Sequence, residues 1–351
     1  MKITLVNERK KKPDFSNLGF GRYFTDHMAV IDYADGKWSE PSIEPYAPFL
    51  IDPAAMVFHY GQAVFEGLKA YRAVDGRILL FRPQMNFARF NHSNERMCIP
   101  HIDDDVVLNL LKELIKIEEE WIPSAPGTSL YIRPFIFATE SAVGVHPSRN
   151  YKFMIILSPV AAYYASGLAP VSIIIEEEYV RSVRGGVGFT KSSANYAISL
   201  KGQEKAIEKG YAQVLWLDGI HRKYIEEVGT MNVFFKIGDT VVTPELNGSI
   251  LAGVTRDSVI KILQSRGIAV EEKKISIDDI CQAYDRGELV EVFGSGTAAV
   301  ISPVGELIFG DKHMKINNGE IGPISQDLYD YLTGLQYGKV KDDRGWVMEV
   351  K

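Results

Sequence analysis

The sequence predicts an α+β protein of two domains, and three observations support this class. The chain has 351 residues, and chains longer than about 250 to 300 residues tend to divide into domains. Hydrophobic residues make up 46% of it, which is ordinary for a globular protein with buried cores. Segments of helical and strand character mix along the chain without a regular β-α-β order, which favours α+β over a doubly wound sheet.

The domain boundary is expected within an uncharged stretch, residues 153–175. Its length would suffice to span a bilayer, but Pro159 and Pro170 disfavour helical geometry in the residues before them. We therefore expect two buried strands joined by a linker. This gives a smaller N-terminal domain over residues 1–160, a linker over 161–170 and a larger C-terminal domain over 171–351.

In the first domain, three segments have the alternation and the β-branched or aromatic content typical of strands: residues 29–33, 78–82 and 128–137. Two segments are expected to be helical. Residues 82–97 form the first, and residues 103–121 form the second, which begins with three aspartates and continues with apolar residues at helical spacing.

In the second domain, residues 194–210 and 255–267 are expected to be helical, and the glycine at the end of the second segment terminates it. Residues 212–218 are expected to form a strand and 289–304 a broken run of strand. Residues 232–244 are expected to form a hairpin that turns at a Gly-Asp pair.

Charge and cysteine content exclude several classes of protein. The chain carries 39 basic and 45 acidic residues, a net charge of −6, so it lacks the basic field that attracts nucleic acid. Cys98 and Cys281 lie far apart and match neither a disulfide framework nor a zinc motif. The N-terminus has basic residues but no apolar stretch after them, so no secretory signal is expected. A cytoplasmic location, with no metal and no membrane, is the expectation.

Lys191 is the residue most indicative of chemistry, because three glycines precede it within residues 185–188 and a helix is expected after it. The segment nearly matches the GxxxxGK[ST] phosphate loop, but Thr190 stands where the second glycine belongs. A phosphate loop therefore remains an alternative, and so does an ordinary solvated lysine. Downstream, the start of the helix after Gly253 offers free backbone N–H groups for an anion.

Several segments together resemble one known family, the branched-chain amino acid aminotransferases, which are pyridoxal 5′-phosphate (PLP) enzymes of fold type IV. The segments follow the family's order over most of the chain: GQAVFEGLKAYR (61–72), LFRPQMNFARF (80–90), LYIRPF (130–135), QVLWLDG (213–219), EEVGTMN (226–232), LAGVTR (251–256) and GSGTA (294–298). The resemblance implies a small α/β N-terminal domain, a large C-terminal domain with a pseudo-barrel sheet, and PLP in the cleft between them. It also implies transamination of leucine, isoleucine and valine with 2-oxoglutarate.

The resemblance assigns the catalytic role to Lys191, whose amine would bind the PLP aldehyde and move a proton between the substrate Cα and the cofactor C4′. Glu227 would keep the ring nitrogen protonated, whereas its neighbour Glu226 is expected to be solvated. Tyr196 would donate a hydrogen bond to the phenolic oxygen of PLP. For the phosphate, the resemblance implies a guanidinium and several N–H or O–H donors, namely Arg89, Thr230, Val254, Thr255 and Thr297.

For the substrate, the resemblance implies one pocket that accepts either an aliphatic side chain or the second carboxylate of glutamate. The residues implied for it are Tyr60, Phe65 and Tyr163 as an aromatic wall, Tyr131 and Arg133 as polar groups for the distal carboxylate, and the backbone at Thr297 and Ala298 for the α-carboxylate. Residues 140–146 resemble the family's loop that reaches the partner's active site. A homodimer is therefore implied, with Val145 as a contact across it.

The sequence departs from the family in two places. Ser192, Ser193 and Ala194 stand where the family usually has glycine before Asn-Tyr, and the CxxC of animal members is absent, with Ala299 and Ser302 in its positions. Three alternatives stay open. A D-amino acid aminotransferase or an aminodeoxychorismate lyase would share Lys191 and Glu227, a nucleotide-binding enzyme would use the lysine on a phosphate, and a binding protein would keep the fold without catalysis.

Overall fold

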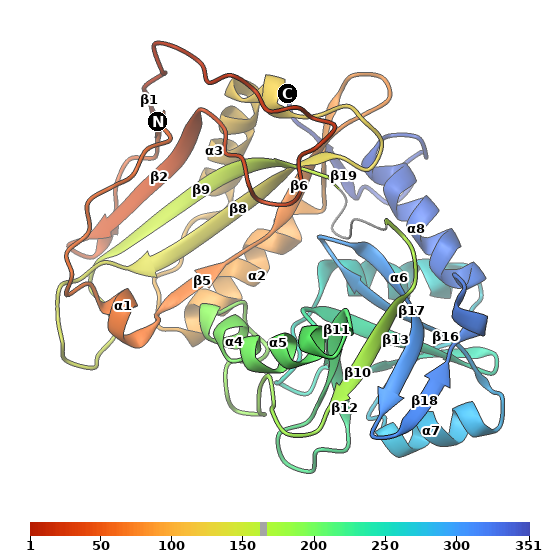
Figure 1. Cartoon of the computed structure of the whole chain (residues 1–351). Coiled ribbons are helices and arrows are strands. Elements are labelled where there is room, and N and C mark those ends of the chain that lie inside the picture. The colour runs from red at the N-terminus through yellow and green to blue at the C-terminus, as the bar shows by residue number, and fades with distance from the viewer. Residues whose placement is uncertain (162–166) are drawn as a thin grey trace. The chain divides into compact units, whose positions relative to one another are not determined.

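The computed structural model describes residues 1–161 and 167–351, which form two compact units (Figure 1). The first unit contains residues 1–161, 190–193 and 334–351, and the second contains residues 167–189 and 194–333. Each unit has its own sheet and its own hydrophobic core. The two units are described separately below.

Among the described residues, the first unit contains a sheet of ten strands in the order β1-β4-β2-β9-β8-β6-β7-β19, with β3 paired to β2 and β5 paired to β8. Its longest pairing is antiparallel, from Ser129 opposite Val160 to Ala138 opposite Tyr151. The strands are β1 (Lys2–Ile3), β2 (His27–Ala34), β3 (Lys37–Trp38), β4 (Ser42–Pro45), β5 (Ala63–Phe65), β6 (Leu68–Arg72), β7 (Ile78–Phe81), β8 (Ser129–Ala138), β9 (Tyr151–Val160) and β19 (Val347–Glu349).

Two long helices cover one face of this sheet, and Figure 1 shows α3 behind strands β2, β9 and β8. The helices of the unit are α1 (Met56–Tyr60), α2 (Pro83–Arg96), α3 (Asp104–Ile117) and the 3-10 turn η1 (Glu119–Trp121). The α3 helix begins where Asp103 accepts a hydrogen bond from the backbone N–H of Val106. Along β8, Leu130 and Ile132 pack against the helices, so the alternating residues between them lie on the opposite face.

The second unit contains a closed six-stranded barrel, because β12-β11-β10-β17-β16-β13 form a continuous order and β12 also pairs with β13. Strands β14, β15 and β18 extend this sheet to nine strands in the described part of the chain. The strands are β10 (Val171–Glu176), β11 (Gln213–Leu217), β12 (Ile225–Val228), β13 (Met231–Ile237), β14 (Thr240–Pro244), β15 (Val270–Lys273), β16 (Leu289–Gly296), β17 (Val300–Phe309) and β18 (Lys312–Lys315). The barrel confirms the pseudo-barrel sheet that the sequence led us to expect.

Helices around this barrel complete the second core, in which alternate residues such as Val233 and Phe235 of β13 are buried. The helices are α4 (Ser193–Ala197), α5 (Leu200–Glu208), α6 (Val254–Ser265), α7 (Ile277–Asp285), the 3-10 turn η2 (Asn317–Gly319) and α8 (Pro323–Gln336). Helix α7 begins with a reciprocal capping box between Ser276 and Asp279. The β13–β14 hairpin turns at Gly238, whose φ of 54° requires the freedom of glycine.

The described residues differ from the expected domain ranges at two segments. Residues 334–351 group with the first unit, because β19 pairs with β7 of that unit. Residues 190–193 also group there, because Ser192 forms a bridge with Val64. The two strands expected in the apolar stretch are confirmed as β9 and β10. Within the described residues, no helix has the length and the hydropathy needed to cross a membrane.

Candidate functional site

The residues expected at the site divide between the two units. The first unit contains Tyr60, Phe65, Arg89, Tyr131, Arg133 and Lys191. The second unit contains Tyr196, Glu227, Thr230, Val254, Thr255, Thr297 and Ala298. Tyr163 lies outside the described residues.

In the first unit, backbone hydrogen bonds hold Lys191 next to strand β5. The carbonyl of Lys191 accepts a hydrogen bond from the backbone N–H of Phe65 at 3.1 Å. Its own N–H donates to the hydroxyl of Ser93, on helix α2, at 2.9 Å. Since both partners are anchored in regular structure, the position of the Lys191 main chain is fixed by β5 and α2.

Two cationic side chains approach the ring of Phe65. Lys191 Nζ is 4.9 Å from the ring centroid, and the guanidinium carbon of Arg133 is 4.6 Å from it. Arg133 donates a hydrogen bond to the Tyr131 hydroxyl at 3.1 Å. A side chain at Gly67 would collide with that hydroxyl, because an added Cβ would lie 2.2 Å from it. The structure thus brings Phe65, Tyr131, Arg133 and Lys191 together.

Arg89 forms a buried ion pair with Glu66, a residue that the sequence analysis gave no role. Its Nε and Nη2 atoms donate to the two Glu66 carboxylate oxygens at 2.7 and 2.9 Å. Burial of Glu66 acts to raise its pKa, but the charge and hydrogen bonds of Arg89, with the charge of Lys191, hold that pKa below its usual value. Arg89 is therefore oriented by a fixed carboxylate rather than exposed on the helix surface.

Lys69 is a second charged residue of this unit that the sequence analysis did not single out. It lies on β6 directly opposite Tyr131 of β8, and its side chain is 7% exposed. Burial lowers the pKa of Lys69 to about 8. A lysine that loses its proton so readily adds a pH-dependent charge to the sheet strands that bear Tyr131 and Arg133.

The loop expected to reach a partner subunit is exposed. Val143 and Val145 are 77% and 83% exposed, and the Tyr60 hydroxyl donates a hydrogen bond to the carbonyl of Val143. Tyr60 is therefore tied to this loop.

In the second unit, three of the expected residues line one small cavity. Tyr196, Glu227 and Thr230 surround it together with four further residues, Arg181, Asn195, Ser199 and Leu251. They come from the loop after β10, helix α4, the residue before α5, strand β12, the turn between β12 and β13, and the loop before α6. A phenol, a carboxylate and a hydroxyl thus converge on a single space.

Glu227 is buried, with 3% of its surface exposed. Its Oε2 atom lies 2.5 Å from Nη2 of Arg181, and its Oε1 atom accepts a hydrogen bond from the Asn232 side-chain amide at 3.3 Å. A guanidinium next to a buried carboxylate stabilises the ionised form. This arrangement suits Glu227 for holding a proton on a neighbouring base.

The expectation that Glu226 is solvated is wrong, because it too is only 3% exposed. Its carboxylate accepts a hydrogen bond from the Ser249 hydroxyl, and the Ser182 hydroxyl oxygen lies 3.4 Å from it. Burial raises the pKa of Glu226 to about 7, although the Ser249 hydrogen bond and the charge of Arg181 act to lower it. Two adjacent buried carboxyls therefore differ in their partners.

The start of helix α6, where the sequence predicts an anion site, lies in the second unit. Val254 is the first helical residue, and the N-cap residue Gly253 has no side chain to cap the helix. Backbone N–H groups of the first turn therefore receive no hydrogen bond from an N-cap side chain. A Cβ at Gly253 would lie 2.1 Å from the side-chain oxygen of Asn232. Thr297 and Ala298 lie half-buried in the turn between β16 and β17.

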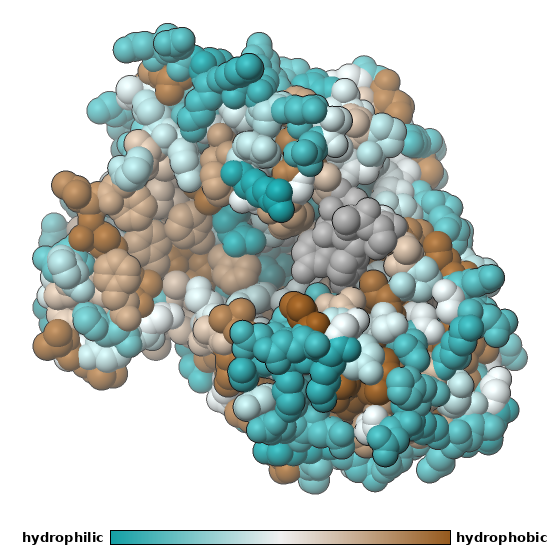
Figure 2. All heavy atoms as spheres, in the orientation of Figure 1, coloured by the Kyte–Doolittle hydropathy of each residue, from teal (hydrophilic) through white to brown (hydrophobic). Residues whose placement is uncertain are grey.

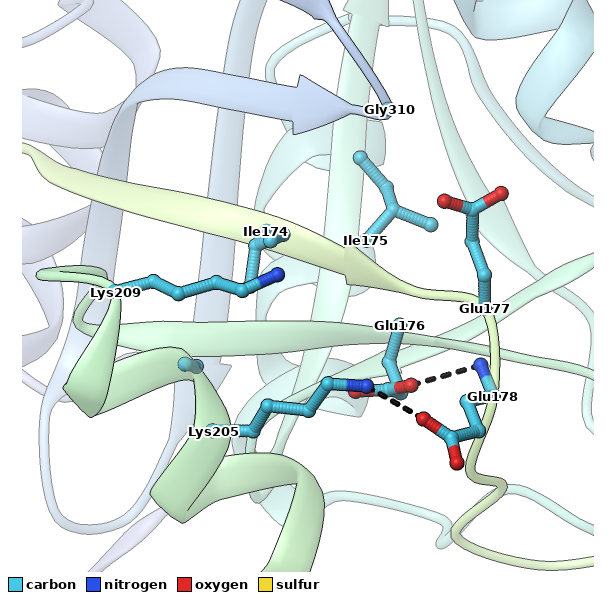
Figure 3. A pocket seen from close by; sticks show the side chains of 9 residues that line it. Ile174, Ile175, Glu176, Glu177, Glu178, Lys205, Lys209 and Gly310 are labelled. Carbon is cyan, nitrogen blue, oxygen red and sulfur yellow. Dashed lines mark hydrogen bonds and ion pairs between the residues drawn. The ribbon is translucent and has the colours of Figure 1, made fainter.

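A second depression lies elsewhere on the second unit (Figure 3). Its lining includes Lys205, which pairs with Glu178 at 2.6 Å, and Glu176, which accepts a hydrogen bond from the Glu178 backbone. The charge of Lys205 is therefore paired with a carboxylate on the surface. None of the expected site residues lines it.

Comparison with known proteins agrees with the fold. The model of the family described as Amino-transferase class IV matches residues 63–307. Branched-chain-amino-acid aminotransferase 2 of Bacillus subtilis is 58% identical over 351 residues, which cover 100% of this chain and 97% of the relative. Branched-chain-amino-acid transaminase 1 of the same organism is 57% identical over 97% of this chain and 96% of its own. The chain therefore belongs to the class IV aminotransferase family, among its branched-chain-amino-acid aminotransferases.

Solved structures give the same result. The Escherichia coli branched-chain amino acid aminotransferase is similar with a TM-score of 0.77 and 26% identity, covering 93% of this chain and 99% of that one. The T.th. branched-chain amino acid aminotransferase, solved as a complex with N-(5′-phosphopyridoxyl)-L-glutamate, has a TM-score of 0.74 and 25% identity over 92% of this chain and 98% of its own. These similarities favour the aminotransferase interpretation of Lys191 over the phosphate-loop alternative.

Sequence reasoning missed Glu66, Lys69 and Arg181, which are all buried and charged. A signal was present for two of them, since Glu66 and Lys69 interrupt otherwise apolar or small residues within GQAVFEGLKAYR. A charged residue within a buried strand requires a partner. Arg181 lies in a polar, glycine-rich segment, where nothing in the pattern distinguishes it from the exposed Arg184.

Proposed function

We propose that the chain transfers the amino group of leucine, isoleucine or valine to 2-oxoglutarate, giving the branched 2-oxo acid and L-glutamate, with PLP as cofactor. The single observation that carries this is the cavity of the second unit, where Tyr196, Glu227 and Thr230 converge. Close identity to named branched-chain aminotransferases supports the substrate class.

The donors in this chain fit PLP chemically. A phosphorylated pyridine with a phenolic oxygen needs an acid partner for its ring nitrogen, a donor for the phenolic oxygen and an anion site. Glu227, Tyr196 and the uncapped start of α6 have these properties in the second unit. In the first unit, Lys191 supplies the amine, and Arg89, oriented by Glu66, supplies a guanidinium for the phosphate. Thr230, Thr255 and Thr297 add hydroxyl and backbone donors.

When bound, PLP supplies an aldehyde that captures amines and a ring that accepts electrons from the substrate carbon. With PLP bound, Lys191 Nζ would, once neutral, act as the base that moves a proton between the substrate Cα and the cofactor C4′. Glu227 holds the proton of the ring nitrogen, and Tyr196 donates a hydrogen bond to the phenolic oxygen. The backbone at Thr297 and Ala298 binds the α-carboxylate.

A single substrate pocket has to accept an aliphatic side chain in one half-reaction and a carboxylate in the other. Phe65 provides an apolar ring that packs against the Arg133 guanidinium. Arg133 in turn donates to the Tyr131 hydroxyl. We propose that the ring contacts leucine, isoleucine or valine, whereas Arg133 and Tyr131 bind the distal carboxylate of glutamate. Tyr60 and Tyr163 complete the aromatic wall in this proposal.

We also propose that the enzyme is a cytoplasmic homodimer. Exposed apolar side chains gather on the first unit, and Figure 2 shows hydrophobic residues on the face where β8 and α1 lie in Figure 1. The exposed apolar residues of this unit include Phe49, Leu50, Phe58, Val143 and Val145. Patches of this kind mark protein interfaces, and Val145 would contact the partner's site. Cys98 and Cys281 are both unpaired, which suits a reducing compartment.

The central test is Lys191→Ala. We expect the variant to lose transamination of leucine with 2-oxoglutarate by at least about 10²- to 10⁴-fold, the usual contribution of a proton-transfer group. Borohydride reduction of the wild-type holoenzyme followed by peptide mapping should label Lys191. The control is Lys201→Ala, because Lys201 is exposed and paired with Glu204, and it should retain label and activity. A label on a different lysine would overturn the assignment, and so would wild-type protein inactive with all three branched-chain donors.

A further inference from the structure

Arg181 is a buried cation to which the proposed function assigns no role. Its side chain is 6% exposed. Its Nη2 atom contacts Oε2 of Glu227 at 2.5 Å and donates to the carbonyls of Gly188 at 3.1 Å and Ser249 at 2.6 Å. A charge buried this deeply is costly unless it is paired and hydrogen-bonded. The position of Arg181 is therefore set by its contacts, and Glu227 is its charged partner.

The surroundings of Arg181 hold it in one orientation. The Ser249 carbonyl accepts from both Arg181 and the Ser182 hydroxyl, the latter at 2.7 Å. The hydroxyl of Ser249 in turn lies within hydrogen-bond distance of the Glu226 carboxylate and of the Asn247 side-chain oxygen. The backbones at Gly188 and Ser249 also approach each other closely, because a Cβ at Gly188 would lie 2.3 Å from the Ser249 carbonyl oxygen. The guanidinium thus has little room to turn away from Glu227.

We propose that Arg181 is a positioning residue for Glu227, which it holds ionised and oriented toward the cavity so that the carboxylate can accept the N–H of the PLP ring nitrogen. Arg181 and Glu227 both line that cavity. Without a cation, burial would favour the neutral carboxylic acid, and Glu227 would then compete with the ring nitrogen for the proton. The guanidinium makes the carboxylate the weaker base, so the proton remains on the ring. This inference rests on the proposed PLP chemistry.

Two further acidic groups, Glu226 and Asp218, lie near the Arg181–Glu227 ion pair. The charge of Arg181 lowers the pKa of Glu226, and the charges of Glu227 and Asp218 raise it. Asp218 is held ionised by hydrogen bonds from backbone N–H groups, which lower its pKa despite its partial burial. Glu226 is neutral in acid and becomes charged as the pH rises through about 7. The measurements below are therefore made at a pH below and a pH above that value.

The test measures PLP binding to the apoprotein by absorbance, for wild type, Arg181→Gln, Arg181→Lys and the control Arg184→Gln at an exposed arginine three residues on. We expect Arg181→Gln to raise the Kd of PLP by about 10- to 100-fold, which is typical for the loss of a hydrogen bond to a charged group. Arg181→Lys keeps the charge and should recover part of the affinity. Arg184→Gln should bind as wild type does. The pH at which the absorption of the bound cofactor changes should also shift in Arg181→Gln.

A double-mutant cycle separates this role from a merely structural one. If Arg181 acts through Glu227, the double variant Arg181→Gln, Glu227→Gln should bind PLP no more weakly than Glu227→Gln alone. Additive losses, or a Kd for Arg181→Gln equal to that of wild type, would overturn the inference. Far-UV circular dichroism checks folding, and the same cycle with Arg181→Lys decides the question if the glutamine variant does not fold. Wild-type protein that binds no PLP would overturn the proposed function itself.

Discussion

Glu226 and Glu227 are neighbours on one strand, yet their environments differ. Glu227 faces a guanidinium at 2.5 Å, whereas the nearest polar side-chain groups to Glu226 are the hydroxyls of Ser249 and Ser182. Burial penalises the charge of a carboxylate, and a close cation offsets that penalty. As a result, the pKa of Glu226 is raised from 4.5 to about 7, and its neutral form is the one that the fold favours.

This environment predicts how Glu226→Gln changes stability with pH. The stabilisation from neutral Glu226 is fully present below the ordinary pKa of 4.5 and is lost as the pH rises through about 7. The neutral glutamine avoids that loss, so the variant should gain up to about 3 kcal/mol relative to wild type between pH 4.5 and pH 8. Urea unfolding of the apoprotein at the two pH values measures the difference. The control Glu177→Gln, at an exposed carboxylate, should show no such pH dependence. The prediction would be contradicted if Glu226→Gln changed the free energy of unfolding by the same amount at both pH values.

At the scale of elements, Asn232 of β13 links the segment before α6 to Glu227. Gly253 stands before the helix, and Asn232 of β13 lies close enough that a Cβ at Gly253 would be 2.1 Å from its side-chain oxygen. The amide of Asn232 donates to Glu227 and, at 2.9 Å, to the Leu251 carbonyl. The helix terminus and strand β12 therefore share one amide side chain.

We expect Gly253→Ala to weaken PLP binding by about tenfold, since the displaced Asn232 would lose a hydrogen bond to charged Glu227. Absorbance titration of the apoprotein measures the Kd. Ser265→Ala is the matched control at the other end of α6, where the exposed Ser265 hydroxyl donates to the Ile262 carbonyl. The link between α6 and Glu227 would be refuted by an alanine variant that binds PLP as tightly as wild type.

At the scale of the whole molecule, the exposed apolar residues of the first unit predict self-association. Phe58 on α1 is 60% exposed and Leu50 is fully exposed. Phe58→Glu should shift the protein from twice the chain mass of 39.3 kDa to the mass of one chain, because a buried charge opposes association. Analytical ultracentrifugation measures this mass. The control Ile207→Glu changes an equally exposed apolar residue on α5 of the second unit and should leave the mass of the protein in solution unchanged. A wild-type protein with the mass of one chain would contradict the proposed dimer.

Much of the fold could be predicted because its signals are local. The period-2 pattern of 128–137, the aspartates before α3 and the Gly-Asp turn of β13–β14 all appear as expected. The expected helix over 194–210 instead divides into α4 and α5, and the expected second helix of the first domain ends at Ile117 before the 3-10 turn η1. Helix ends depend on which residues pack against the core, and periodicity alone does not contain that information.

The sequence by itself determined the family, the candidate lysine and the type of each long element, because ordered motifs and apolar periodicity depend only on the order of residues. Tertiary structure decided where charge is buried. It placed Glu66 against Arg89, Glu227 against Arg181 and Glu226 among hydroxyls. It also joined β19 to β7 across more than 250 residues of chain. The cost of a buried charge depends on which distant groups surround it, and only the folded chain brings those groups together.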